Sequence, residues 1–190
     1  NHVADISWNK GQKLSSTDKD NTRAHFFSNS VINLGLSGFD ESKVEVNLQR
    51  TTNDQYLKVY KLKSPLMDST SSMSSFINFE ANKSDLSLNT SIEVYEDLTK
   101  SQSDRYEYVF PNFNVVKEID LNNSYNGSLS LESTGFQKLH NTNIYNASLI
   151  NELMLKSDPI FSINGLKSNY SILLKNVNLD SENSKVNKNK

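Results

Sequence analysis

The sequence predicts an all-β protein: an antiparallel up-and-down meander that forms a segment of a large transmembrane outer-membrane β-barrel. Apolar and polar residues alternate along many segments, most clearly in 85–96, where Leu88, Ile92 and Val94 face away from Asn89 and Glu93. Such segments are about long enough to cross a bilayer when tilted. Only 35% of the 190 residues are hydrophobic and the mean hydropathy is −0.60, which suits a barrel with a hydrated interior.

Five strands are predicted in the first half of the chain, at 3–8, 24–36, 43–49, 73–81 and 85–96. In each of them every second residue is mostly apolar, so the apolar residues share one face. Ser28 and Ser30 interrupt that face in the second strand. The short turn at 82–84 joins two alternating runs, which is typical of a hairpin. Within the longer excursion 50–72, a short strand is expected at 56–62.

Four more strands are predicted at 105–118, 127–138, 143–156 and 160–176, which gives about nine in all. Tyr106, Tyr108 and Phe110 share one face of the first of these. Pro111 lies inside the same strand and cannot donate a ladder hydrogen bond, so a bulge or bend is expected there. The run 147–156 has helical propensity, but the alternation continues through it and favours a strand.

The lengths of the connections predict which side of a membrane each one occupies. Outer-membrane barrels have short periplasmic turns and longer extracellular loops. The turns at 38–42, 82–84, 120–126 and 157–159 are therefore expected to be periplasmic. The loops at 9–22, 50–72 and 97–104 and the C-terminal tail are expected to be extracellular, and the short turn at 139–141 is an exception. Both chain ends are interpreted as cuts through a longer protein, so 1–190 is expected to be one incomplete barrel domain.

Composition and motifs give no positive indication of an enzyme. The net charge of −2 provides no basic face for nucleic acid, and the absence of cysteine excludes disulfides and thiolate metal sites. His2, His25 and His140 are far apart in sequence and are interpreted as surface or strand residues. No GxSxG elbow or plausible Ser–His–acid set is found, and 35–38 is not a phosphate loop. No catalytic, cofactor-binding or metal-binding residue is predicted.

Two further groups of residues have an ordinary explanation. Acidic residues near adjacent strands and loops could form a paired-carboxylate site, but a solvated acidic lumen or loop is the favoured interpretation. These residues are Asp54, Glu93, Glu96, Asp97, Asp104 and Glu107. N-x-S/T sequons occur at Asn82, Asn126 and Asn146, as expected by chance in a chain rich in Asn and Ser.

Three stretches in order resemble the barrel of the LptD family of outer-membrane lipopolysaccharide-assembly proteins. The first is VEVNLQRTTNDQYLKVY at 44–60, where Asn53 stands in place of the usual Ser. The second is 87–111, a strand ending in YEDL, a polar loop, and then YEYVFP. The third runs from Gly135-Phe136 to the KNVN at 175–178. Together these stretches cover most of the chain.

The resemblance implies an interior part of the LptD barrel, in the outer membrane of a Gram-negative bacterium. The family receives lipopolysaccharide from a periplasmic protein bridge and places it in the outer leaflet, with an LptE-type lipoprotein plug inside the barrel. The bridge would be reached through an N-terminal domain outside this chain. The family's periplasmic jellyroll, disulfide cysteines and lateral-gate strands are likewise expected outside this chain, so no gate or ligand-binding residue is assigned.

Two other classes remain as alternatives. A different outer-membrane barrel, such as a porin or receptor, would show the same alternation. A secreted β-sandwich used for adhesion or glycan binding would instead pack the apolar faces of 43–49 and 85–96 against each other across a core. The barrel predicts one outward apolar band, with Tyr95, Tyr106 and Tyr108 near its edges as candidates for an aromatic girdle.

Overall fold

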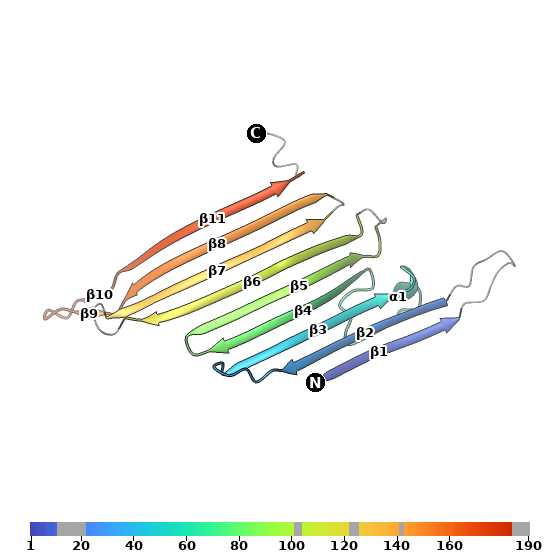
Figure 1. Ribbon diagram of the computed structural model, residues 1–190, viewed down its shortest axis with the longest axis horizontal. Helices are drawn as coiled ribbons and strands as arrows, with labels where there is room; N and C mark the ends of the chain where they lie inside the picture. The colour runs from blue at the N-terminus through green and yellow to red at the C-terminus, as the bar shows by residue number, and fades with distance from the viewer. Residues whose placement is uncertain (11–21, 101–103, 122–125, 141–142, 184–190) are drawn as a thin grey trace.

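The computed structural model describes residues 1–10, 22–100, 104–121, 126–140 and 143–183 as a single sheet with short attachments. The sheet has nine strands, and each pairs antiparallel with its neighbour in chain order (Figure 1). The strands are β1 (His2–Lys10), β2 (Thr22–Asn33), β3 (Glu41–Thr51), β4 (Ser72–Lys83), β5 (Leu86–Asp97), β6 (Tyr106–Asp120), β7 (Gly127–His140), β8 (Ile144–Ser157) and β11 (Ser171–Glu182). The predictions of an all-β fold and an antiparallel meander are confirmed.

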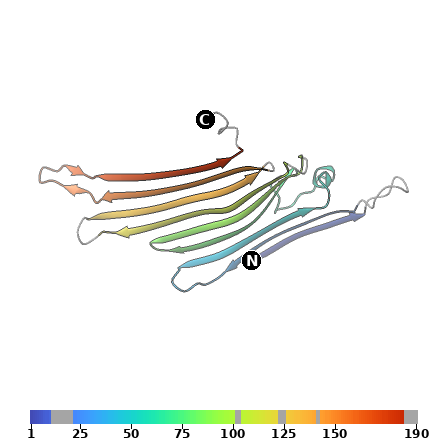
Figure 2. The same ribbon diagram turned by 45° about the horizontal axis from the view of Figure 1, so that its top comes forward.

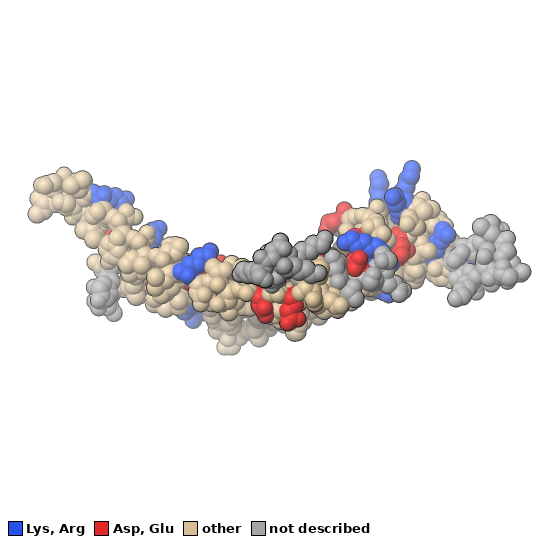
Figure 3. All heavy atoms as spheres, turned by 90° about the horizontal axis from the view of Figure 1, so that it is seen from above, with Lys and Arg blue, Asp and Glu red and all other residues tan. Residues whose placement is uncertain are grey.

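The sheet is open and one layer thick. Strands β1 and β11 lie at opposite edges, and neither is paired on its outer side within the sheet (Figures 1 and 2). Seen from above, the molecule is bent along its length and is not flat (Figure 3). The described strands therefore form a curved wall and do not close into a barrel.

Cross-strand register keeps residues of one kind on the same face. In the β4–β5 hairpin, Lys83 pairs with Leu86 across a two-residue turn, which brings Ile77 opposite Ile92. Register between β3 and β4 likewise places Val46 opposite Ile77. Since opposite residues point to the same side, the sheet has one apolar and one polar face.

A bulge interrupts β6 at the position that proline predicts. The β5–β6 register shifts between Ser91 and Glu93, and the β6–β7 register shifts between Val109 and Asn112. Pro111 lies inside this interval, and the Phe110–Pro111 peptide bond is cis. The expected irregularity is confirmed, because a proline inside a strand cannot donate to the ladder.

Two predicted elements are wrong, and other strand ends differ by up to three residues; β2, for example, ends at Asn33 and not at residue 36. Residues 56–62 do not form a strand but include a single helical turn, α1 (Tyr56–Val59), because the adjacent residues Tyr56 and Leu57 are both buried, which strand alternation does not allow. The last strand does not run over 160–176. Two short strands, β9 (Ile160–Phe161) and β10 (Lys167–Ser168), form a hairpin around Gly165, whose φ is 77°. The ninth strand of the sheet begins only at Ser171 and extends into the predicted tail.

The strand prediction for 147–156 is confirmed. Residues 147–156 are strand and not helix, because they pair with both β7 and β11. The predictions that fall on 11–21, 101–103, 122–125, 141–142 and 184–190 lie outside the described residues. In the part of the chain that the structure describes, no helix has the length and apolar character needed to cross a membrane.

Buried apolar side chains gather at one end of the sheet, near the ends of β2 and β4. The cluster consists of Phe27, Tyr56, Leu57, Met73 and Leu98, with Leu62, Leu66 and Met67 packed against it. Elsewhere, the apolar side chains that a β-sandwich would bury are exposed, including Leu48, Ile77 and Ile92. The core packing expected of the sandwich alternative is not seen in the described residues.

Candidate functional site

The polar face carries a row of amide and carboxylate side chains from β2 to β8. We define it by Asn29, Glu45, Asn78, Glu93, Asn112, Glu132 and Glu152. Asn29 Nδ2 donates to Glu45 Oε1 at 2.7 Å. Asn112 Nδ2 donates to Glu93 Oε1 at 3.1 Å, and Asn114 Nδ2 donates to Glu132 Oε1 at 3.0 Å. Neutral donors thus bind Glu45, Glu93 and Glu132 and leave their negative charge on the face.

A shallow hollow lies in the middle of this row. Its lining is Glu45, Ser74, Phe76, Asn78, Asn89, Ser91, Glu93, Tyr95 and Asn112. Ser91 Oγ and Tyr95 Oη both donate to the Glu93 carboxylate, at 2.5 Å each. The lining groups offer hydrogen bonds to hydroxyl-bearing or hydrated solutes but include no base–nucleophile pair.

Tyr95 is therefore not a girdle residue of the apolar face. It follows Val94 in β5 and points to the opposite side, toward Glu93. Tyr108 does lie on the apolar face, opposite Val94, and Tyr106 stacks near it with a ring-centroid distance of 6.1 Å. The predicted group of three tyrosines is wrong in this one member, because alternation separates neighbours in a strand.

The second component of the site is the segment 52–71, here called the docked segment, which covers one end of the polar face. It leaves the end of β3, includes α1 and returns to β4 (Figure 1). Tyr56 Oη lies 2.7 Å from Ser7 Oγ on β1, and the Tyr56 ring lies 6.0 Å from the ring of His25 on β2. Ser7 and His25 are on the side of Asn29 and Glu45, so the docked segment covers polar rather than apolar face.

No Ser–His–acid set is evident in the sequence, yet the β1–β2 register brings a serine, a histidine and an aspartate together. Ser7 Oγ lies 2.9 Å from His25 Nδ1, and Asp5 Oδ1 lies 3.3 Å from His25 Nε2. That Nε2 has no hydrogen-bond partner, so Asp5 does not orient the ring as the acid of a catalytic triad does. The serine hydroxyl is also bound to Tyr56. The group links β1, β2 and α1, and only strand register reveals it.

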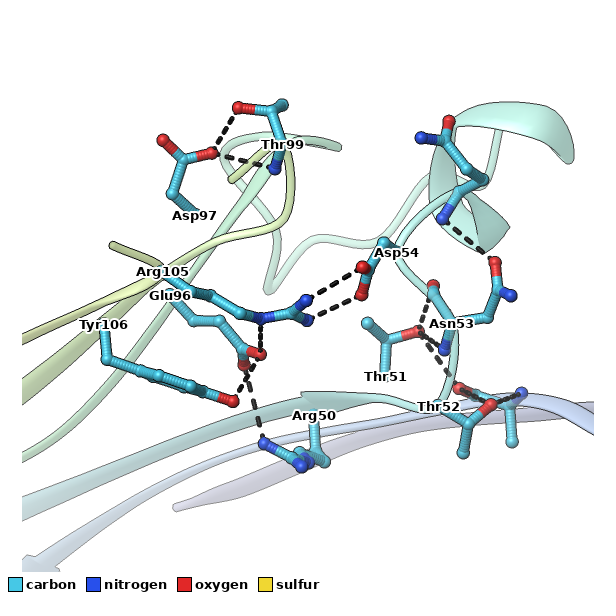
Figure 4. Close-up of polar contacts among 12 residues, drawn as sticks. Arg50, Thr51, Thr52, Asn53, Asp54, Glu96, Asp97, Thr99, Arg105 and Tyr106 are labelled. Carbon is cyan, nitrogen blue, oxygen red and sulfur yellow. Dashed lines mark hydrogen bonds and ion pairs between the residues drawn. The ribbon is translucent and has the colours of Figure 1, made fainter. Parts of the chain in front are cut away.

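An ion-pair network joins the docked segment to the end of β5 and to Arg105, the residue before β6 (Figure 4). The Arg105 guanidinium donates to both carboxylate oxygens of Asp54, at 2.8 and 2.6 Å, and its Nε donates to Glu96 Oε1 at 2.6 Å. Tyr106 Oη donates to Glu96 at 2.9 Å, and Arg50 Nη1 lies 3.6 Å from Glu96 Oε2. The Glu96 side chain is only 7% exposed, so it depends on these cations.

The electrostatics of this network oppose acid–base chemistry. Hydrogen bonds from Arg105 hold the pKa of Asp54 below its ordinary value, and the same bonds raise the pKa of Arg105. Asp54 and Glu96 are two of the predicted acidic residues, but one guanidinium separates them. They do not form a carboxylate pair that shares a proton.

The other acidic residues of the prediction are dispersed. Asp97 Oδ1 accepts from Thr99, and Glu107 pairs with Lys138 at 2.6 Å. Asp104 borders a hollow beside Arg105. These placements agree with the interpretation of solvated acidic loops and strands.

The three histidines lie in three different places in the structure. His2 Nδ1 is 2.5 Å from Ser30 Oγ, His25 is buried beside Phe27, and His140 ends β7. Among the described residues, no group of three or more His, Asp or Glu side chains is arranged to hold a metal ion. Of the sequons, Asn82 accepts a hydrogen bond from Ser87 at 2.8 Å and Asn146 lies in β8.

The opposite, apolar face is not uniformly apolar. Phe26, Val46, Ile77, Ile92 and Leu131 lie on this face. Ser133 Oγ donates to Asn151 Oδ1 at 2.8 Å on the same side, and Asn176 is opposite Asn151 in register. The serines in β2 are evident in the sequence as interruptions of an apolar face. This second polar row is not, because only the pairing of β7, β8 and β11 brings its residues into line.

Comparison of the chain with protein-family models, with curated proteins and with solved structures found no match.

Proposed function

We propose that this chain is part of the wall of an outer-membrane β-barrel that transports lipopolysaccharide and assembles it into the outer leaflet. The observation that carries the proposal is a single-layer, curved sheet whose polar and apolar faces are both largely uncovered. A water-soluble fold buries its apolar face against a second layer. A barrel wall instead places it against lipid and the polar face against a hydrated interior.

The chemistry of the two faces suits an amphiphile as cargo. Lipopolysaccharide has a polar head and acyl chains, so it needs a hydrated route for the first and an apolar surface for the second. The carboxylates and amides around Glu45 and Glu93 supply hydrogen-bonding groups along such a route. The resemblance to the LptD family adds the partners: an LptE-type plug lipoprotein inside the barrel, and a periplasmic bridge that delivers the cargo.

Depletion of the full-length protein tests this function. The expected result is a loss of lipopolysaccharide from the cell surface, measured by surface labelling of intact cells. Unchanged surface lipopolysaccharide would reject the transport role. A spin label at Leu88 should be more accessible than one at Asn89 to a lipid-soluble quencher, and equal accessibility would reject the assignment of the faces.

A porin or receptor barrel is the second candidate. The open hollow lined by Glu45, Asn78, Glu93 and Asn112 favours it, because such groups also line routes for small hydrophilic solutes. The two functions separate in the same depletion strain. A porin predicts reduced uptake of small solutes with normal surface lipopolysaccharide.

A further inference from the structure

The docked segment is built as a fixed structure and not as a free loop. Leu57 is fully buried against Phe27, which is also fully buried. Gln49 Nε2 donates to the Leu66 carbonyl at 2.5 Å, and the Leu98 N–H donates to the Ser71 carbonyl at 2.9 Å. The segment thus has its own small core and is hydrogen-bonded to β3 at one side and to the end of β5 at the other.

The Arg105 network closes the segment across the sheet. Asp54 follows β3 and Arg105 precedes β6, so their bidentate pair spans the ends of the intervening strands β4 and β5. Glu96, at the end of β5, receives the third hydrogen bond of the same guanidinium. The Arg105 side chain therefore connects Asp54 in the docked segment with Glu96 at the end of β5 (Figure 4).

We propose that the docked segment is an inner strap that narrows the passage along the polar face at this end, and that Arg105 is the latch that holds it there. The inference rests on the proposed function, because a constriction requires a wall around a passage. The strap occupies the polar side of β1 and β2 through its contacts with Ser7 and His25, where solute or cargo would otherwise pass. Arg105 is a positioning residue and need not touch what passes.

The test uses the full-length protein in liposomes and the variant Asp54→Asn. Asparagine keeps the shape of the side chain but removes the charge that Arg105 holds, while Glu96 keeps its bond. Trypsin cleavage after the exposed residues Lys58, Lys61 and Lys63 reports opening of the strap, because cleavage requires local unfolding. We expect cleavage about twofold to fivefold faster than in the wild type. Influx of sucrose, an uncharged probe, should rise with it.

Asp97→Asn is the matched control, since Asp97 lies at the same end of the sheet but bonds Thr99 and Lys100. It should leave cleavage and sucrose influx at wild-type values. Tyr56→Phe is a second variant that keeps the ring packing and removes only the bond to Ser7. It should raise both readouts by a smaller factor than Asp54→Asn.

Two results overturn the proposal. Unchanged cleavage in Asp54→Asn would show that Arg105 is not a latch. Faster cleavage with unchanged sucrose influx would show that the segment does not narrow a passage. Neither result bears on transport, which is judged separately by surface lipopolysaccharide after depletion of the wild-type protein, so failure of one idea is distinguishable from failure of the other.

Discussion

Strands β1–β5 carry the docked segment and nearly all of the buried apolar side chains, whereas no residue of β7, β8 or β11 belongs to the buried apolar cluster. The same alternation of residues is present in both regions. In the first region it is combined with a segment that packs on one face. In the second no segment covers the described strands: most residues of β7 and β8 are half-buried between their neighbours, and in β11 every residue but one is exposed. Alternation alone therefore makes a strand, and a covering element makes a local core.

Loss of the buried leucine should give the largest effect. Leu57→Ala leaves a cavity in the only sizeable apolar cluster of the described residues and should destabilise the docked segment by about 3 kcal/mol. The matched change Leu174→Ala on β11, where the side chain is 60% exposed, should cost less than about 0.5 kcal/mol. Hydrogen–deuterium exchange of the full-length protein measures both. Equal effects would mean that the two regions do not differ in packing.

Neutralising a buried carboxylate should rank second. Glu96→Gln removes the charge that Arg105 and Arg50 face and should destabilise this end of the sheet by about 2 kcal/mol. Glu152→Gln in β8 is the comparison, because Glu152 pairs with an exposed Lys175. That change should cost less than about 0.5 kcal/mol. Similar protection factors in the two variants would contradict the special status of the Glu96 site.

Gly135 in β7 provides a smaller test in the second region, which consists of β7, β8 and β11. A Cβ at this position would lie 2.7 Å from Phe113 Cε1 and 3.0 Å from the Ser148 carbonyl oxygen. Gly135→Ala should therefore destabilise the pairing of β6, β7 and β8 by about 1 kcal/mol, because the Phe113 ring must move. Adding Phe113→Leu should recover part of the loss, as measured by urea denaturation in detergent. An unaltered midpoint in the single variant would show that the ring is not fixed over the glycine.

The smallest effect is expected from pH. The pKa of Asp54 is lowered in the folded protein, so its pairing contributes fully above the ordinary aspartate value, near 4, and is lost as the pH falls through the lower folded value. Asp54 is partly exposed, so the contribution should be below about 1 kcal/mol. Protection of the amides of Tyr56 and Leu57 should be constant from about pH 5 to 8 and fall only in stronger acid. Asp54→Asn should lose that acid dependence.

The strands were predictable because their signal is local. In 43–49 and 85–96, each residue's face follows from its two neighbours, and pairing only aligns faces that already exist. The bulge at Pro111 was predictable for the same reason, since proline lacks a donor wherever it lies. The C-terminal boundary was not, because 160–176 has no strict alternation and an exposed edge offers no burial to fix where pairing starts.

The docked segment and its latch were beyond prediction from sequence because they join residues distant in the chain. Nothing near Asp54 indicates that Arg105, which lies 51 positions later, will bind it. Ser7, His25 and Tyr56 likewise meet only because β1 and β2 pair in one register and α1 folds back over them. The acidic residues were predicted to be solvated and not to form a carboxylate pair, but only the ends of the strands decide that Asp54 and Glu96 both bind Arg105.

The sequence by itself thus determined that the chain makes strands and, in most of them, which side chains share a face, since these properties depend on a two-residue period. Tertiary structure alone decided that residues 52–71 fold over the polar face and that Arg105 binds Asp54 and Glu96 at its edge. Those outcomes depend on burial and charge pairing between distant segments, whose energies no local pattern records.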